Sequence, residues 1–399
     1  NGLEKRPKLR FPGFDEPWKA EMLSDFSERV TRKNTKNETN LPLTISSKDG
    51  LVDQISYFNK MVASKDISSY YLLKEGEYAY NKSYSVGYDF GSIKRLDHYP
   101  MGALSTLYIC FALKRHNSDF IRAYFDSLKW YREIYMISAE GARNHGLLNV
   151  PTEDFFQTIH YLPQDTREQR KIANFIITLD RRIDAQQSLV KSLKKYKRGL
   201  LNKLFSNINS NIYPTVYLSE VADFLQGLTY SPSDVSVSGY LVLRSSNIQN
   251  GMLSFDDCVY VDKKVDESLQ VKCDDVIMCV RNGSKNLVGK TALIPPNMPM
   301  TTWGAFMMII RSKLNDTYIF HYLNSQMFFS QVFKDTGTAT INQITKGILN
   351  ECRLPLPPET ERKQISKMLS SFDAKIQNAE KCLATLVNLK KALLQQLFI

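Results

Sequence analysis

Apolar residues between positions 163 and 205 recur at alternating steps of four and three, which is the spacing of a heptad seam. The pattern lasts for more than four heptads, so it predicts a long coiled-coil helix rather than an ordinary surface helix. Two polar residues complete the ten seam positions, which are Ile172, Ile176, Leu179, Ile183, Gln186, Val190, Leu193, Lys197, Leu200 and Leu204.

The same seam returns 193 residues later, at the end of the chain. Its positions are Ile365, Leu369, Phe372, Ile376, Ala379, Leu383, Leu386, Lys390, Leu393 and Leu397, and Lys390 repeats the out-of-place Lys197. A lysine on a seam fixes register at some cost in stability. Each helix of some 40 residues would be a rod of roughly 60 Å, at ~1.5 Å per residue, and its natural partner is the other copy. Antiparallel pairing would bring Gln186 to Ala379 and place one globular domain at each end.

The chain therefore divides into residues 1–162, a helix over 163–207, residues 208–353 and a helix over 354–399. The two globular parts are of the α/β (α+β) class, with strands and helices in a similar order. Strands are predicted at 43–47, 78–80 and 105–113, with a helix capped by Ser118. Their counterparts are strands at 241–246, 275–280 and 305–311, followed by a helix over 317–333.

Signals at the ends of the segments agree with these boundaries. Thr166 and Gln169 have the spacing of a capping box at the start of the first helix. Pro357 and Pro358 stop any helix before the second copy begins. The proline-containing run 7–14 predicts an extended arm.

Charge is concentrated in the two helical segments. Residues 163–205 hold eleven basic and four acidic side chains, and residues 353–399 hold eight and four. These segments thus account for the whole net charge of +11, and the globular parts sum to neutral. A polyanionic partner is expected, but the charge alone argues weakly for DNA binding by the globular parts.

Cysteine spacing and hydropathy limit the class of protein. The six cysteines form no CxxC pair, and Cys110, Cys273 and Cys279 lie in apolar strand-like runs. This pattern favours reduced, buried thiols in a cytoplasmic protein over disulfides or a zinc site. With no run of 18 apolar residues and a polar start, neither a membrane span nor a signal peptide is expected.

The whole chain resembles the specificity subunit of type I restriction–modification systems. The resemblance is carried by the arm 7–14, the junction from Leu162-Pro163 through Glu168-Gln169 to Ile172, its copy 354–358, and the helix ends 197–205 and 390–398. The second copy departs from the pattern, because Glu361-Arg362 stands where the first copy has Glu168-Gln169.

The resemblance implies two target recognition domains that each read one half of a split sequence in double-stranded DNA. The paired helices would hold the domains apart, and two modification subunits would dock there and methylate adenine with S-adenosylmethionine. Restriction subunits would add ATP- and Mg-dependent translocation and cleavage. The chain itself is then a non-catalytic subunit. It contains no Asp/Asn-Pro-Pro-Tyr/Phe motif, Walker A loop, GxGxxG or HExxH.

Base reading needs amides, hydroxyls or cations on loops carried by a rigid sheet. Any one of these side chains could equally be a solvated loop residue or a turn cap. The candidates are Ser46, Ser47, Lys48, Lys82, Ser83, Tyr84, Arg143, Asn144 and His145 in the first half, and Arg244, Ser245, Asn247, Arg281, Asn282, Ser284, Lys285, Asn286, Thr338 and Thr340 in the second.

Two other classes of function stay open from the sequence. A structural spacer would join two protein-binding domains without reading DNA, and the reader-rich loops in both halves argue against it. A self-contained DNA-modifying enzyme is disfavoured by the missing cofactor motifs. The basic run 191–198 fits a solvated face or a subunit-docking face better than direct DNA contact.

Overall fold

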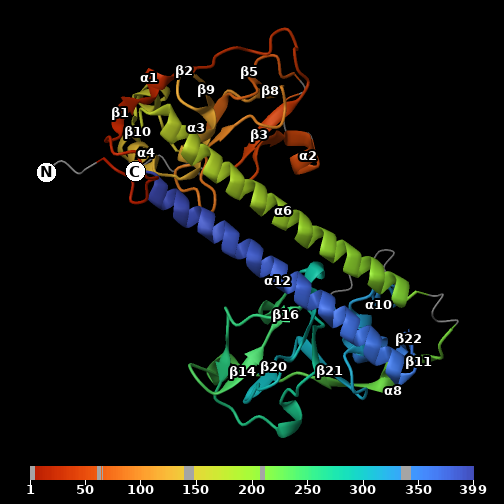
Figure 1. The fold of residues 1–399 in the computed structure, drawn as a ribbon. Coiled ribbons are helices and arrows are strands. Elements are labelled where there is room, and N and C mark those ends of the chain that lie inside the picture. Colours follow the sequence, from red (N-terminus) through yellow and green to blue (C-terminus); the bar gives the residue numbers. More distant parts are fainter. Residues whose placement is uncertain (1–4, 61–63, 65, 139–147, 207–211, 334–342) are drawn as a thin grey trace. The chain divides into compact units, whose positions relative to one another are not determined.

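The structure is a computed structural model that describes residues 5–60, 64, 66–138, 148–206, 212–333 and 343–399. These residues form two compact units, shown in Figure 1. The first unit comprises Asn1–Gln186 and Cys382–Ile399, and the second comprises Gln187–Lys381. Each unit therefore contains one globular region and a part of both long helices, α6 (Thr166–Leu204) and α12 (Glu359–Leu397).

The first unit is built on two four-stranded sheets and a two-stranded ribbon. One sheet is antiparallel in the order β2-β9-β6-β7, and the other has the order β4-β3-β8-β5 with β3 and β8 parallel. The strands are β1 (Lys19–Met22), β2 (Ser27–Arg29), β3 (Pro42–Ser46), β4 (Gly50–Asp53), β5 (Tyr71–Lys74), β6 (Tyr78–Asn81), β7 (Ser92–Arg95), β8 (Met101–Leu104), β9 (Ile109–Leu113) and β10 (Ile159–Leu162). The helices are α1 (Leu23–Phe26), α2 (Gln54–Phe58), α3 (Ser118–Asp126), α4 (Tyr131–Ile137) and α5 (Thr152–Gln157).

The second unit repeats this architecture. Its antiparallel sheet has the order β12-β21-β18-β19, and its mixed sheet has the order β13-β17-β14-β20 with β14 and β20 parallel. The strands are β11 (Thr215–Tyr217), β12 (Ala222–Gln226), β13 (Val235–Ser236), β14 (Tyr240–Leu243), β15 (Ile248–Gln249), β16 (Met252–Leu253), β17 (Tyr260–Val261), β18 (Val276–Cys279), β19 (Thr291–Leu293), β20 (Thr301–Trp303), β21 (Met307–Ser312) and β22 (Arg353–Pro355). The helices are α8 (Leu218–Val221), α9 (Tyr318–Leu323), α10 (Gln326–Val332) and α11 (Lys346–Glu351), with short 3-10 turns at Pro232–Asp234, Ser245–Asn247, Glu267–Leu269 and Lys285–Leu287.

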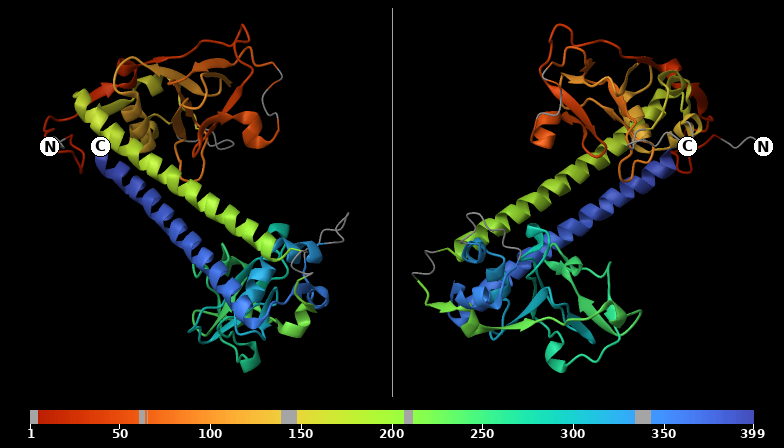
Figure 2. Two further views of the ribbon diagram at one scale, coloured as in Figure 1. Left: turned by 45° about the vertical axis from the view of Figure 1, so that its right-hand side comes forward. Right: turned by 180° about the vertical axis from the view of Figure 1, so that it is seen from behind.

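The predicted fold class and internal repeat are therefore confirmed. The ribbon β1–β10 corresponds to β11–β22, and both ribbons lead directly into a long helix (Figure 2). The strands predicted near Leu43 and Tyr78 are β3 and β6, and those predicted at 241–246 and 275–280 are β14 and β18.

Each long helix takes part in both hydrophobic cores. In the first unit, the beginning of α6 and the end of α12 pack with α3 and the antiparallel sheet, through residues such as Ile172, Ile176, Leu394 and Leu397. In the second unit, the end of α6 and the beginning of α12 pack with α9 through Leu201 and Leu369 in the same way. Both units thus need a helical segment from a distant part of the sequence to complete their cores.

All twenty predicted seam positions are buried or half-buried, and none is exposed. In the first unit Lys390 Nζ lies 2.5 Å from Asp180 Oδ1. In the second unit the repeat-related Lys197 pairs with Asp373, and Lys194 pairs with Glu380 at 2.7 Å. In these ion pairs, residues later in α6 pair with residues earlier in α12, so the helices run antiparallel within each unit.

The N-terminal arm, which is predicted from its prolines, packs on the parts of α6 and α12 that belong to the first unit. Arg10 donates to both carboxylate oxygens of Glu168 at 2.8 and 2.9 Å. The Leu9 amide donates to the Gln396 carbonyl at 2.9 Å, and the ring of Phe11 contacts that of Phe175 at 5.7 Å. The arm therefore joins the beginning of α6 to the end of α12.

The capping box predicted at Thr166 and Gln169 is wrong. Asp165 is the cap, because its Oδ1 accepts from the Arg167 amide at 2.7 Å. Gln169 is fully buried and donates to the Pro163 carbonyl at 2.7 Å, and its Oε1 accepts from the Asn117 amide at 2.8 Å. Gln169 thus fastens the start of α6 to the loop before α3.

Arg362 occupies the position of Gln169 in the second copy and makes the corresponding contacts. Its guanidinium donates to the Pro357 carbonyl at 3.3 Å and to Asp316 Oδ2 at 2.7 Å, in the loop before α9. The departure of Glu361-Arg362 from the first copy is therefore a change of partners and not a loss of the contact.

Four local predictions need correction. The helix expected over 317–333 is broken into α9 and α10, because the Ser325 hydroxyl caps a new helix at the Phe328 amide. Asn117, and not Ser118, caps α3, through its Oδ1 and the Phe120 amide at 2.9 Å. The strand expected over 105–113 begins only at Ile109, after a turn. Cys273 is exposed, since it precedes β18 in a turn, whereas Cys110 and Cys279 are buried as expected.

Candidate nucleic-acid interface

Two of the predicted reader loops come together at one edge of the first unit. They follow β3 and β6, which belong to different sheets. The Ser47 hydroxyl lies 2.9 Å from the Ser85 hydroxyl and 3.1 Å from that of Ser92. Lys48 and Tyr84 are exposed beside this contact, and the Tyr84 side chain is 57% exposed. The loops thus form one continuous polar edge.

The second unit joins the equivalent loops, which follow β14 and β18. Asn282 Nδ2 donates to the Ser245 hydroxyl at 3.2 Å. The Asn282 Oδ1 accepts from the Ser284 amide at 2.9 Å, which shapes the loop that carries Arg281, Ser284 and Asn286 to the surface. The pairs Ser47–Ser85 and Ser245–Asn282 link the same two loops in both units.

The sequence did not identify a third segment of this edge, which is the turn between β20 and β21. The amides of Gly304 and Arg281 donate to the carbonyls of Leu243 and Phe306 at 3.0 and 3.2 Å, so the turn lies between the two reader loops. The Phe306 side chain is 59% exposed, and the Arg281 guanidinium lies 5.4 Å from the centre of its ring.

The corresponding turn of the first unit, between β8 and β9, carries Leu107, which is 67% exposed. A large apolar side chain at the tip of a turn in both halves was the available sequence signal. The single strands predicted over 105–113 and 305–311 run through these two turns and therefore hide them, whereas β9 and β21 begin only at Ile109 and Met307.

Burial removes two residues from the predicted readers. Asn247 is fully buried, its Nδ2 donates to the Ser254 and Asp257 carbonyls, and its Oδ1 accepts from the Arg244 amide. Ser46 is also buried, and its hydroxyl bonds to Asp49 at 2.7 Å. Both side chains hold their own loops in shape, so neither is presented to a ligand.

The remaining candidates differ in their exposure and in whether they bond to other residues of the protein. Arg244 pairs with Asp257 at 2.8 Å and is half-exposed. Lys82 and Ser83 are half-buried, and the Ser83 amide donates to Asn81 Oδ1 at 3.0 Å. The predicted loop residues that lie outside the described part of the chain are Arg143, Asn144, His145, Thr338 and Thr340, together with the side chain of Lys285.

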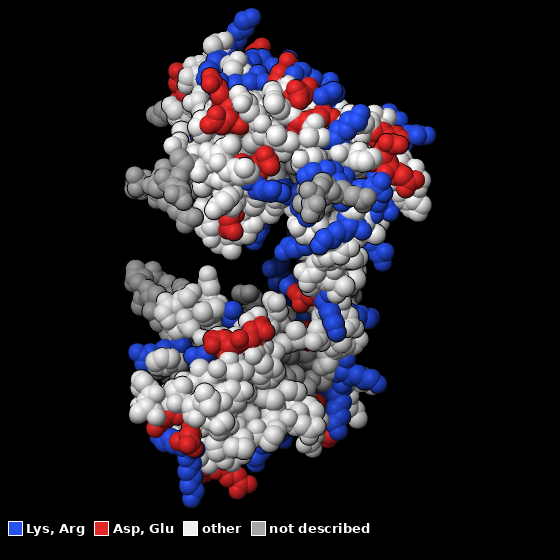
Figure 3. Space-filling model, turned by 90° about the vertical axis from the view of Figure 1, so that its left-hand side faces the viewer, with Lys and Arg blue, Asp and Glu red and all other residues white. Residues whose placement is uncertain are grey.

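The exposed cations described on these edges include Lys48 in the first unit and Arg281 in the second. Figure 3 shows Asp and Glu interspersed with Lys and Arg on one face of the molecule. Beneath the second-unit loops, burial raises the pKa of the Cys279 thiol. The protonated thiol donates to the Arg281 carbonyl at 3.7 Å and supports the start of the loop. The edge can therefore offer hydrogen bonds and single positive charges to a polyanion.

Within the described ranges, no three His, Cys, Asp or Glu side chains gather where they could hold a metal ion. Over the same residues, no helix combines the length and apolar character needed to cross a membrane.

Comparison with known proteins shows which family the second half of the chain resembles. Residues 213–387 match the family model of the type I restriction modification DNA specificity domain. This part of the chain therefore resembles the DNA specificity domain of type I restriction–modification systems. The chain is similar to the EcoKI specificity subunit of Escherichia coli (strain K12), with 28% identity over 171 residues that cover 41% of this chain and 36% of that protein. The chain thus spans little more than a third of that relative's length.

Solved structures agree on the fold over nearly the whole chain. The type I S subunit from M. genitalium superposes with a TM-score of 0.59 and 16% identity, covering 99% of both chains. A chain from a structure that addresses complex assembly of the type I R-M system gives a TM-score of 0.58 and 19% identity, covering 96% of this chain and 99% of that chain. The similarity in fold therefore extends over both units and both long helices.

Proposed function

We propose that this chain is the DNA-reading subunit of a type I restriction–modification complex and recognises a bipartite site in double-stranded DNA. Each unit would read one half-site with the edge formed by its two loops and the intervening turn. Direct readout requires hydrogen-bonding groups on a rigid support that reach the base edges, and loops fixed at the ends of sheet strands provide such a support.

One observation carries this proposal. The contact between the two reader loops recurs in both units, as Ser47–Ser85 in one and Asn282–Ser245 in the other, while the exposed side chains around it differ. The first edge presents Lys48 and Tyr84, and the second presents Arg281 and Phe306. A repeated scaffold with unlike surfaces suits the reading of two unlike half-sites.

In the proposed complex, other subunits catalyse the reactions. Modification subunits would dock on α6 and α12 and bring S-adenosylmethionine for adenine methylation. Restriction subunits would use ATP and Mg. This chain would bind, orient and separate the half-sites, and the complex would act in the cytoplasm. The exposed Lys191, Lys195 and Arg198 on α6 are candidates for the docking face.

Methylation-sensitive sequencing of DNA from cells that carry this chain with its partner subunits tests the proposal. The expected result is one split sequence that is methylated at nearly every occurrence. Exchange of residues 1–160 for the matching region of a relative is expected to change one half-site and preserve the other. Methylation without a split consensus, or a change in both half-sites on exchange, would contradict the proposal.

A further inference from the structure

A large apolar side chain stands at the same place in the turn of both edges. The turns 105–108 and 304–307 each close with a hydrogen bond from the last amide to the first carbonyl, at 3.3 and 2.8 Å. The third residue is Leu107 in the first turn and Phe306 in the second, and these side chains are 67% and 59% exposed. We call these two side chains the apolar tips.

The strand pairings show that the two turns correspond. In the first unit β8 is parallel to β3 and β9 is antiparallel to β6, so the turn that joins β8 to β9 lies between the loops that follow β3 and β6. In the second unit β20 and β21 have the same relation to β14 and β18. Leu113 and Ser312 end β9 and β21, and they pair with Ser27 and Ala222, which directly follow α1 and α8. Each apolar tip lies six positions before that pair.

Backbone hydrogen bonds hold the second turn against both of its neighbours. The Gly304 amide donates to the Leu243 carbonyl, at the end of β14, at 3.0 Å. The Phe306 carbonyl accepts from the Val280 and Arg281 amides, just after β18, at 3.0 and 3.2 Å. The apolar tip is therefore a fixed part of the edge, so a ligand that contacts it does not have to order the turn first.

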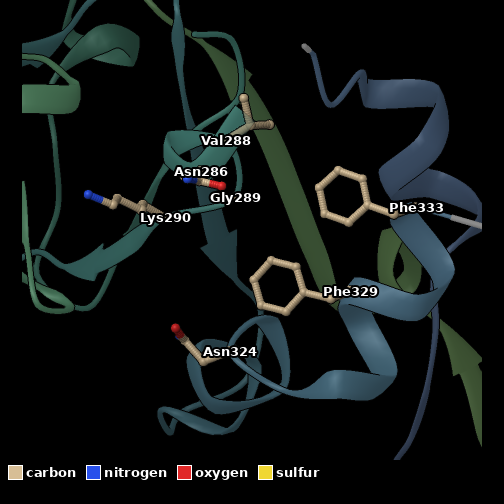
Figure 4. Close-up of a pocket in the computed structure, with 7 residues that line it drawn as sticks. All are labelled: Asn286, Val288, Gly289, Lys290, Asn324, Phe329 and Phe333. Carbon is tan, nitrogen blue, oxygen red and sulfur yellow. The ribbon is translucent and has the colours of Figure 1, made fainter. Parts of the chain in front are cut away.

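Two other aromatic side chains near the second reader loop line a cavity instead of the edge. Phe329 and Phe333 are half-buried beside a cavity of about 390 Å³, which they share with Asn286 and Val288 (Figure 4). A single exposed apolar side chain is ordinary on a protein surface and needs no explanation. Exposure at the same turn position in both units, between loops whose side chains differ, is what points to a ligand.

Such a ligand has to offer an apolar group among polar ones. In the major groove of DNA the base edges present hydrogen-bond donors and acceptors, together with the C5-methyl group of thymine. Apolar side chains, phenylalanine among them, contact this methyl group directly. Insertion between stacked bases would also cover an apolar tip, but it adds the cost of unstacking, which a methyl contact avoids.

We propose that Leu107 and Phe306 each contact the methyl group of one thymine in the half-site that their own unit reads. The surrounding loops would bind the polar edges of neighbouring base pairs. The Arg281 guanidinium, 5.4 Å from the centre of the Phe306 ring, would lie beside the thymine of the second unit. Both apolar tips are then specificity-determining residues. The inference rests on the proposed function, because it needs DNA at each edge.

The test uses the full chain in its complex and a duplex that carries the methylated split sequence. Each thymine is replaced in turn by deoxyuridine, which lacks only the methyl group. One replacement in each half-site is expected to weaken binding by about fourfold, the effect of losing one buried methyl group.

Alanine variants assign each methyl contact to its residue. Phe306→Ala is expected to remove the deoxyuridine effect in one half-site and Leu107→Ala in the other, so each variant is a control for the other. Phe306→Leu places the residue of the first turn in the second and should keep the effect. Met300 is 51% exposed at the opposite end of β20, and Met300→Ala, the matched control, should leave both effects unchanged.

The outcomes separate the methyl contact from the function on which it rests. If no deoxyuridine replacement weakens binding, or if the effect persists in both alanine variants, the methyl contact is overturned while recognition of the split sequence stands. A rise in 2-aminopurine fluorescence that depends on Phe306, without a deoxyuridine effect, would assign the tip to insertion between bases and also overturn the proposal. Loss of preference for any split sequence in the wild-type complex would overturn the proposed function itself.

Discussion

At the scale of single residues, a polar side chain in a loop is available to a ligand only if it is not already hydrogen-bonded within its own loop. Asn247 and Arg281 looked alike in the sequence, as hydrogen-bonding residues after a buried strand. The Asn247 carboxamide forms hydrogen bonds within its own loop through Nδ2 and Oδ1, whereas Arg281 is exposed beside Phe306. No local pattern distinguishes them, because the bonds of Asn247 reach carbonyls seven and ten residues away.

Arg281→Glu is expected to weaken DNA binding by about 5- to 150-fold, the effect of losing one arginine contact to a base edge or phosphate. The salt dependence of the binding constant should also become shallower by about one unit. Fluorescence anisotropy with a duplex that carries the site, measured over a range of salt concentrations, checks both. Lys264→Glu makes the same charge change at an exposed position outside the edge, so an equal loss there would show that only net charge matters.

Two histidines give the protein a pH dependence of stability. Burial lowers the pKa of His160 to about 3, and the pKa of His321 falls to about 3 through burial and the nearby Lys197 charge. Unfolded histidine titrates near 6.5, so only the unfolded state takes up these protons between pH 6.5 and 3. The stabilising contribution is therefore present above pH 6.5 and is lost as the pH falls below it.

As the pH falls from 7 to 5, the free energy of unfolding should decrease by about 2 kcal/mol for each histidine. Urea unfolding at several pH values measures this loss. His160→Gln should be less stable at pH 7, because His160 bonds to Tyr124 and Thr158 at 2.8 Å, but its stability should decline less toward pH 5. His98 is exposed, and His98→Gln should follow the wild-type curve. Parallel curves for wild type and His160→Gln would refute the argument.

At the scale of elements, the repeated heptad pattern was the strongest source of correct prediction. Periodicity over 39 residues specifies a helix whatever its surroundings, and the seam residues are buried or half-buried as expected. Sequence did not reveal that the helix ends enter the globular cores, because the contacts of Leu394 and Leu397 with α3 join residues far apart in the chain. Caps were misplaced by one residue, at Asp165 and Asn117, since neighbouring polar residues compete for the same amides.

The seam lysines are expected to stabilise helix pairing through their carboxylate partners. A double-mutant cycle of Lys390→Ala and Asp180→Ala, followed by urea unfolding, should give a coupling of about 1 kcal/mol, because both side chains are about three-quarters buried. The pair Lys363–Glu359 lies on the exposed face of α12 and should couple more weakly. Equal coupling in both cycles would show that the seam position confers no advantage.

At the scale of the whole molecule, the fold is two copies of one α/β unit with different surfaces. The reader-loop contact, the exposed turn and the helix anchors at Gln169 and Arg362 each occur twice with different side chains. The duplication keeps the same loop contacts and helix anchors in both units, while the exposed side chains differ. It predicts that damage to one edge leaves the other edge able to read its own half-site.

Lys48→Glu in the first unit and Arg281→Glu in the second test this independence. Each is expected to relax the preference for bases in one half-site, and a different half-site in each variant. Because the two residues belong to separate units and share no loop, their binding free-energy changes should add in the double variant to within about 0.5 kcal/mol. Competition binding with duplexes altered in one half-site at a time measures both effects. If either variant relaxed both half-sites, the two edges would not be separate readers, and recognition would have to be assigned to the chain as one indivisible surface.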